Sequence, residues 1–359
     1  MSILTRLLTK MVVSRFVAVL LGLTLFALML DVLSNVDAIL EYRNNEYTAL
    51  AHYAALRFPQ VVSTFWPLSL LLAVLLMLVE LSWRNELVAL WAAGLSPLRM
   101  IVMLLPLGLA LGAANFLIDD RLTPLTAQEL RQWGIGDYAR KKRLQLGERD
   151  PMWMRAGRDI VRAEKINADM TEIDGMTIFR RDADGLLLEQ IIAESAQLRE
   201  GRWILRRVLV YNRDGTEPER LDVLVYSGNL RIAAAGARSG EPQEMSLASL
   251  QYFIANEGFG IRPVFVYEVW WHKRLSLLIA AWLVIAVCIP LSARYRRGGA
   301  VGYMFGAGIF IGFAFFIFDG ISMTMGEMGL VPPWMAVWIP LIVLGLVAAA
   351  LLLRAESVS

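Results

Sequence analysis

The sequence predicts a membrane α-helical protein with six transmembrane helices and an all-β, jelly-roll-like domain between the third and fourth helices. Three observations predict this fold class. The 359 residues are 57% hydrophobic and only 19% charged, whereas soluble proteins are about 45–50% apolar and about 25% charged. Most charged residues lie between Asp119 and Arg262, and the long flanking stretches carry almost none. Between those two positions, the apolar residues follow the short alternating runs of β-strands.

Six segments are long and apolar enough to cross a bilayer, which takes about 20 residues for roughly 30 Å of hydrocarbon. They cover residues 12–38, 61–79, 100–118, 275–293, 300–318 and 334–353. Helix is the expected form, because every backbone N–H in hydrocarbon needs a partner within its own segment. We therefore expect three transmembrane helices in residues 1–118 and three in residues 266–359. An uncleaved first helix fits the N-terminus better than a signal peptide, since no clear cleavage site follows the apolar run.

Basic residues in the short loops predict the orientation, because Lys and Arg are retained in the cytoplasm. They lie in both terminal tails and in the loops after the second and fourth spans: Arg6, Lys10, Arg84, Arg99, Arg294, Arg296, Arg297 and Arg354. The loop before Trp334 offers only Glu327. We expect both termini in the cytoplasm and the central domain on the opposite side of the membrane.

Residues 119–265 have the pattern of a β domain with a helical start at residues 122–143. Strand-like runs cover residues 177–180, 186–192, 196–199, 203–211 and 221–226, with Asp-Gly and Glu-Gly turn signals between them. Residues 193–211 predict a hairpin that turns at Glu200-Gly201, with Trp203 inward. Inward positions, as core or as the lining of a groove, are expected for Ile178, Leu187, Ile191, Leu205 and Val223; core is the default.

The motifs of several enzyme classes are absent from the sequence. His52 and His272 are its only histidines and Cys288 its only cysteine, so a metal site built on these residue types is not expected. Neither a G-x-S-x-G elbow nor a G-x-x-x-x-G-K-[ST] phosphate loop occurs. We expect no enzyme, no bound cofactor and no hydrolysis of ATP by the chain itself. The net charge of +2 and its mixed distribution do not suggest nucleic-acid binding.

A short amphipathic helix is expected after the second span, at residues 84–95. Leu87, Leu90 and Trp91 have the i, i+3, i+4 spacing of one apolar face, and Glu86 lies beside it. From the residues alone, a helix anchored among lipid headgroups is at least as well supported as a helix that docks a partner protein.

This segment reads Arg-x-Glu-Leu-Val followed by Ala-x-Gly-Leu-Ser, from Arg84 to Ser96, with Gly94 as a natural stop for the helix. Directly after a second span, the motif resembles the LptF/LptG permeases of lipopolysaccharide export. The resemblance covers nearly the whole chain. Three further details are similar to the LptG branch of the family: Val36-Asp37, Phe318-Asp319-Gly320 and Gly329-Leu330-Val331-Pro332-Pro333.

The resemblance implies a permease subunit of an inner-membrane ABC transporter that extracts lipopolysaccharide for assembly of the outer membrane. The implied partners are an LptF-like permease in a heterodimer, a cytoplasmic LptB-like ATPase dimer that uses ATP and magnesium, and an LptC-like bridge protein in the periplasm. The central domain is then a periplasmic outlet. Residues 84–95 become a coupling helix seated in the ATPase, and its coupling residues are Arg84, Glu86, Leu87, Leu90, Trp91 and Gly94.

Contacts to the glycolipid are expected from basic residues near the outer ends of the spans, because cations pair with phosphate. Arg131 lies where the family carries a basic residue after the third span, and Arg43 and Arg57 are candidates by position. Residues 140–143 fit an exposed basic helix end better than a head-group site.

Two carboxylates at the ends of spans are also substrate-site candidates. Asp37 and Asp319 either face a cavity or a partner or are simply hydrated at the interface. Ser34 and Asn35 stand where LptG-type sequences usually have a lysine. A lysine–phosphate contact is therefore not carried over to this chain.

Other functions stay open at this point. A lipoprotein-release-type ABC permease places its large domain after the first of four spans, whereas three spans precede it here. A membrane-anchored periplasmic sensor or scaffold needs no docking helix. The motifs Gly302-x-x-x-Gly306 and Gly308-x-x-x-Gly312 in the fifth span indicate close helix packing, either within the chain or with another subunit.

Overall fold

The protein is described by a computed structural model that covers residues 3–43, 46–136, 138, 152–156, 158–166, 171–182, 186–199, 202–213, 217–227, 241–255, 263–294 and 301–356. The chain divides into two compact units. One consists of Met1–Gly136 with Glu268–Ser359, and the other of Asp137–Tyr267. Each unit is considered by itself below.

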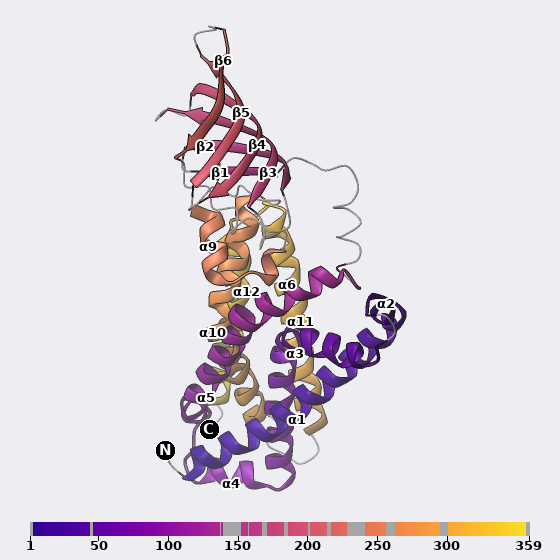
Figure 1. The fold of residues 1–359 in the computed structure, drawn as a ribbon. Helices are drawn as coiled ribbons and strands as arrows, with labels where there is room; N and C mark the ends of the chain where they lie inside the picture. The colour runs from indigo at the N-terminus through magenta and orange to yellow at the C-terminus, as the bar shows by residue number, and fades with distance from the viewer. Residues whose placement is uncertain are drawn as a thin grey trace. The chain divides into compact units, whose positions relative to one another are not determined.

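Six helices of the first unit are long and apolar enough to cross a membrane, which confirms the predicted number of spans (Figure 1). They are α1 (Ile3–Ser34), α3 (Thr48–Trp83), α5 (Pro97–Leu117), α10 (Val264–Arg294), α11 (Val301–Glu327) and α12 (Pro333–Glu356). Most of them extend beyond the predicted apolar segments. The 36 residues of α3 measure about 54 Å, against about 30 Å of hydrocarbon, so helical structure continues into polar residues outside the apolar segment.

Two helix ends differ from the sequence prediction. The first span ends at Ser34, and after Asn35 a separate short helix, α2 (Val36–Tyr42), replaces the predicted end at residue 38. After α5 the chain continues through a π-helix (Ile118–Leu122) into α6 (Thr123–Trp133). The predicted helix at residues 122–143 is confirmed as far as α6. Gly134, in the left-handed region at φ 63°, ends it, and residues 140–143 lie outside the described part of the chain.

The core of the helical unit forms around α3. Apolar residues along it are buried between the neighbouring helices: Leu70, Leu71, Val74, Leu75, Met77 and Leu78. On one side Phe16 of α1 meets Trp66 of α3 edge to face, with ring centroids 4.9 Å apart.

The glycine motifs of α11 have different surroundings. A Cβ at Gly308 or Gly312 would lie 2.4 or 2.2 Å from a terminal methyl of Leu75 or Leu71 of α3, so any larger residue would require that leucine to shift. Around Gly302 and Gly306, no heavy atom of the described residues lies within 4 Å of the corresponding position. The second motif therefore packs within the chain, and the first leaves an open helix face.

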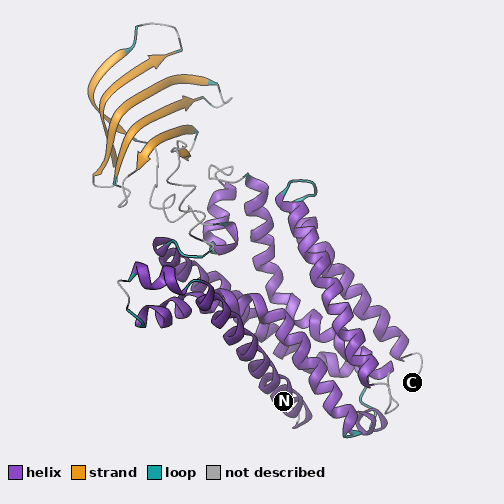
Figure 2. Cartoon of the chain, turned by 90° about the vertical axis from the view of Figure 1, so that its right-hand side faces the viewer, coloured by secondary structure: helices purple, strands orange, loops and turns teal. Residues whose placement is uncertain are grey.

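The second unit contains a six-stranded antiparallel sheet with the sequential order β1-β2-β3-β4-β5-β6, and Figure 2 shows it strongly curved. The strands are β1 (Met152–Ala156), β2 (Asp159–Ile166), β3 (Glu172–Arg181), β4 (Leu187–Arg199), β5 (Arg202–Asn212) and β6 (Glu219–Tyr226). The predicted all-β domain is confirmed. Among the described strands the connectivity is that of a meander, without the crossovers expected for a jelly roll. Strands β1 and β2 were not predicted, because charged residues interrupt their apolar pattern.

The predicted hairpin is confirmed by the pairing of Arg199 with Arg202, which leaves a two-residue connection between β4 and β5. Trp203 is only 1% exposed, and Ile178, Ile191 and Leu205 are buried beside it as predicted. Tyr226 completes this core: its hydroxyl donates to Asp159 Oδ2 at 2.8 Å, and burial raises the pKa of its phenol far above the usual value. The tyrosine therefore stays protonated and keeps its hydrogen bond across the physiological pH range.

Two predicted inward positions are wrong: Leu187 is 45% exposed and Val223 is 55% exposed. Leu187 lies at the start of β4, next to a register irregularity at Arg180/Arg181. Val223 is displaced by an irregularity that crosses the sheet. We call this irregularity the crease. It consists of one residue from each of the strands β2 to β6, and the strand register places these residues side by side: Glu164, Gly175, Glu194, Arg207 and Asp222.

At the crease, buried positions are three residues apart instead of two. Ala193 and Ala196 of β4 pair with Val208 and Leu205 of β5, and all four are buried. Positive φ angles at Gly175 (71°) and Arg207 (52°) interrupt the extended backbone there. The side-chain alternation therefore shifts by one residue, which reverses the face expected from a period of two.

We predict that Gly175→Ala destabilises the sheet by about 1–2 kcal/mol, the cost of a left-handed backbone for a residue with a Cβ. The new Cβ would also lie 2.6 Å from Glu164 Oε2. Hydrogen–deuterium exchange of the full chain should show faster exchange in β3 and β4. In a Glu164→Ala background the clash with the carboxylate should disappear, while the contact with Cβ of residue 164 at 3.0 Å and the backbone part remain. Unchanged protection in both backgrounds would show that the crease does not require glycine.

Candidate functional site

The predicted short helix, α4 (Glu86–Ala92), lies at the end of the helical unit where both chain termini are found (Figure 1). It follows α3 after two residues, Arg84 and Asn85, and Asn85 has a left-handed backbone at φ 58°. At its other end Leu95 N–H donates to Leu90 O at 3.1 Å and Gly94 N–H donates to Trp91 O at 3.0 Å. With Gly94 at φ 83°, these bonds form a Schellman motif. Gly94 therefore stops the helix as predicted.

The apolar face of α4 is turned toward the helical bundle. Leu87 is 3% exposed, and Leu90 and Trp91 pack against the same hydrophobic core as α3 and α5. These three residues anchor the helix to its own chain, which leaves the opposite face exposed. The exposed side chains between positions 83 and 93 are those of Trp83, Arg84, Asn85, Glu86, Val88, Ala89, Ala92 and Ala93. We call residues 83–93 the docking segment.

An ionic network leads from the docking segment to α1. Glu80, near the end of α3, contacts the guanidinium of Arg15 through Oε2 and accepts from Arg84 Nη2 through Oε1 at 2.9 Å. Arg84 Nη1 also lies 4.0 Å from Glu86 Oε1. Arg15 and Glu80 were not predicted as site residues, because each is a single charge at the end of an apolar segment with no local signal for its partner.

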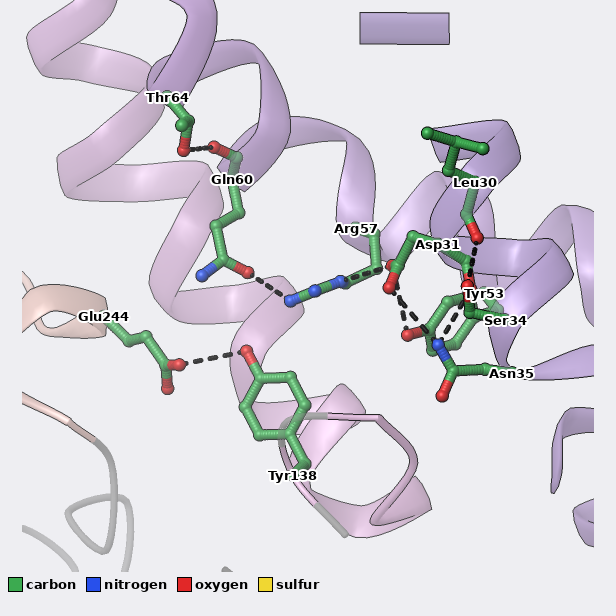
Figure 3. Close-up of polar contacts among 10 residues, drawn as sticks. All are labelled: Leu30, Asp31, Ser34, Asn35, Tyr53, Arg57, Gln60, Thr64, Tyr138 and Glu244. Atoms are coloured by element: carbon green, nitrogen blue, oxygen red, sulfur yellow. Dashed lines mark hydrogen bonds and ion pairs between the residues drawn. The ribbon is translucent and has the colours of Figure 1, made fainter. Parts of the chain in front are cut away.

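A second polar cluster joins the other ends of α1 and α3 (Figure 3). Asp31 Oδ2 accepts from Arg57 Nε at 2.8 Å and from the Tyr53 hydroxyl at 3.2 Å. Asn35 Nδ2 lies 3.3 Å from Asp31 Oδ1, and Arg57 Nη1 donates to Gln60 Oε1 at 2.8 Å. The predicted substrate residue Arg57 is therefore already neutralised by a carboxylate, with only 11% of its side chain exposed.

Trp133 of α6 brings the other two predicted basic residues into the same region. The Arg43 guanidinium lies over the Trp133 ring at 5.1 Å, and Tyr42 and His52 stack on that ring. Arg131, two residues earlier on α6, donates from Nε to the backbone oxygen of Ala127 at 3.0 Å. The structure thus places Arg43 against Trp133, whereas Arg57 contacts Asp31 and Gln60 and Arg131 bonds to its own helix.

The two predicted carboxylates have separate surroundings. Asp319 of α11 accepts from Lys273 Nζ of α10 at 2.7 Å, so it ties two spans together. Asp37 is exposed in the first turn of α2, where the helix dipole favours an acidic side chain.

Lys273 and its neighbour Arg274 are further charged residues that the sequence analysis did not single out. Arg274 pairs with Asp119 of the π-helix and is 1% exposed. No group of three or more His, Cys, Asp or Glu side chains within the described ranges is placed to hold a metal ion.

Comparison with known proteins points to one family. The family model described as lipopolysaccharide export system permease LptF/LptG matches residues 6–354. The lipopolysaccharide export system permease protein LptG of Escherichia coli strain K12 is 22% identical over 348 residues, which cover 94% of this chain and 95% of that protein. The LptG protein of Escherichia coli O6:H1 aligns with the same identity and coverage.

We predict that Asp31→Asn lowers the free energy of unfolding by about 1–3 kcal/mol, because it leaves the Arg57 charge without its carboxylate. The effect should be smaller than for a fully buried pair, since Asp31 keeps 22% of its side-chain exposure. Thermal unfolding of the purified protein measures the change. Asp37→Asn, an exposed carboxylate six residues away, is the matched control and should be neutral. Equal effects of the two substitutions would contradict a structural role for the Asp31–Arg57 pair.

Proposed function

We propose that this chain, which belongs to the LptF/LptG family of lipopolysaccharide export permeases, is the LptG-type half of a transporter that extracts lipopolysaccharide from the inner membrane. As a member of that family it is a transport subunit of an ABC transporter. The full-length match to two LptG proteins supports the LptG-type assignment. The basic loop residues support cytoplasmic termini, which puts the sheet domain in the periplasm, where it passes the glycolipid to an LptC-like bridge protein.

The docking segment is the observation that carries the proposal. Its apolar face is anchored in the bundle core, so the exposed face is held in a fixed position with Glu86 and Arg84 on it. This is what a coupling helix needs when it transmits force from an LptB-like ATPase. The chain itself has no phosphate loop, so ATP and magnesium are used by that partner. Glu86 is suited to pair with an Arg or Lys of the ATPase, and Leu87, Leu90, Trp91 and Gly94 hold the helix in place.

The junction of α2, α3 and α6 is the proposed contact site for the phosphorylated head group. Arg43, Arg57 and Arg131 lie at the end of α2, on α3 and on α6, and cations of this kind pair with phosphate. Arg57 already donates to Asp31 from Nε and to Gln60 from Nη1, so a phosphate group competes with these two acceptors for the guanidinium. Asn35, which stands where LptG-type sequences usually have a lysine, contacts the same carboxylate.

Asp37 and Asp319 have different proposed roles at the substrate site. Asp37 is exposed near the head-group site and repels phosphate rather than binding it. Asp319 holds Lys273, and through it fixes the spacing of α10 and α11.

The open face of α11 supports a second permease subunit as a partner. Phe310, Phe313 and Ile317 are exposed there together with the uncovered Gly302 and Gly306. Small residues four apart permit close contact between helices in lipid, so an LptF-like subunit in a heterodimer suits this face. A lipoprotein-release-type permease is less favoured because of the three-plus-three layout of spans. A sensor or scaffold is less favoured because it has no use for a docking segment.

The proposal predicts that the protein purified from a Gram-negative membrane carries stoichiometric LptF-like and ATPase subunits. Glu86→Lys should lower the recovered ATPase at least about tenfold, since like charges across an interface cost several kcal/mol. Lipopolysaccharide export should fall with it. Lys10→Glu, a charge reversal at an exposed residue of α1, is the control and should leave both unchanged. Isolation of the chain alone, together with normal export by the Glu86→Lys variant, would overturn the assignment.

A further inference from the structure

Glu80 contacts two arginines, Arg15 and Arg84, although one would neutralise its charge. Its two carboxylate oxygens serve two guanidinium groups on opposite sides: Oε2 contacts Arg15 of α1, and Oε1 accepts from Arg84 at 2.9 Å. One arginine would be enough to compensate one carboxylate. The bridge therefore makes a continuous ionic path from the docking segment to the first transmembrane helix.

The side chains of this bridge are sheltered to different degrees. Arg15 is 20% and Glu80 is 32% exposed, whereas Arg84 is 64% exposed. An exposed ion pair contributes little by itself, but charges at the end of a membrane span are more costly to leave alone. The Arg15–Glu80 pair is therefore the more stable contact of the bridge, and Arg84 is the residue that a docking partner can reach.

The bridge is also anchored at its two ends. Arg15 Nη1 donates to the backbone oxygen of Met11 at 2.6 Å, which fixes the guanidinium to α1. Arg84 is the last residue before the left-handed Asn85, and its N–H donates to Glu80 O at 3.0 Å. A displacement of the docking segment is therefore passed to Glu80 through both backbone and side chain.

Helix α1 carries the displacement toward the other end of the bundle. Arg15 and Asp31 are 16 positions apart on one uninterrupted helix, which corresponds to about 24 Å. Near its far end α1 is tied to α3 by the Asp31–Arg57 pair, which holds the arginine of the proposed head-group site. The two ion pairs between α1 and α3 thus involve residues about 24 Å apart on the same helix.

We propose that Glu80 is a positioning residue that couples the docking segment to α1 through Arg84 and Arg15, so that movement of the ATPase reaches the head-group site. The inference rests on the proposed function. Glu80 contacts neither nucleotide nor lipopolysaccharide in this account. Its role is to keep export in proportion to ATP hydrolysis.

The test uses the whole complex, with the second permease and the ATPase, reconstituted in proteoliposomes that contain lipopolysaccharide. Glu80→Gln should leave subunit assembly intact and reduce the lipopolysaccharide released per ATP hydrolysed by at least about fivefold, the lower end of typical coupling between sites. Arg15→Gln breaks only the α1 arm and should show the same loss, whereas Arg15→Lys keeps the charge and should restore part of it. Lys10→Gln is the matched control for loss of one charge in α1 and should keep the wild-type ratio.

A purely structural role gives a different pattern, in which Glu80→Gln lowers stability or assembly but leaves the ratio of export to hydrolysis at the wild-type value in the complexes that form. That pattern, in Glu80→Gln and Arg15→Gln alike, would overturn the inference. If the Glu80→Gln complex does not assemble, the Arg15 variants decide the question, because they leave the Glu80–Arg84 contact in place. Failure of the wild-type complex to release lipopolysaccharide on ATP addition would instead contradict the proposed function.

Discussion

An ionisable side chain in or beside a membrane span is costly unless a partner neutralises it, and this constraint determines how the six helices are joined. Arginine or lysine pairs with a carboxylate of another helix at four places in the described part of the bundle: Arg15–Glu80, Asp31–Arg57, Lys273–Asp319 and Arg274–Asp119. Apolar contacts alone fix helix register weakly in lipid, because lipid tails are as apolar as leucine. The charged pairs supply the register that apolar side chains do not.

The positions of these pairs connect the fold with transport. Two of them hold α1 against α3 at both ends, and close packing at Gly308 and Gly312 holds α11 against the other side of α3. The faces of α1 and α11 that point away from α3 remain largely uncovered, which suits a second subunit. In the proposed transport cycle α3 is the fixed centre, and the docking segment is the part that moves.

Local patterns in the sequence were sufficient for much of the fold. Apolar length predicted the six spans, Gly94 predicted the end of α4, and the Glu200-Gly201 turn predicted the β4–β5 hairpin, because each depends on neighbouring residues. Long-range features could not be predicted in this way. The spacing of Leu87, Leu90 and Trp91 identified an apolar face but not what it packs against, and no local signal pairs Arg15 with Glu80. The crease shifts the alternation of side chains by one residue in five strands and so turns Val223 to the exposed face. A prediction that assumes strict alternation along each strand cannot include such a shift.

The most direct measurement of the central claim, that this chain handles lipopolysaccharide, is photo-crosslinking in living Gram-negative cells. A photoreactive amino acid at Gln60, beside Arg57, should give an adduct with lipopolysaccharide that depends on an active ATPase. The same amino acid at Leu346, exposed on α12, should give adducts with ordinary phospholipid only. Lipopolysaccharide adducts at Gln60 would support the account. Adducts with phospholipid alone at both positions, whatever the state of the ATPase, would contradict it.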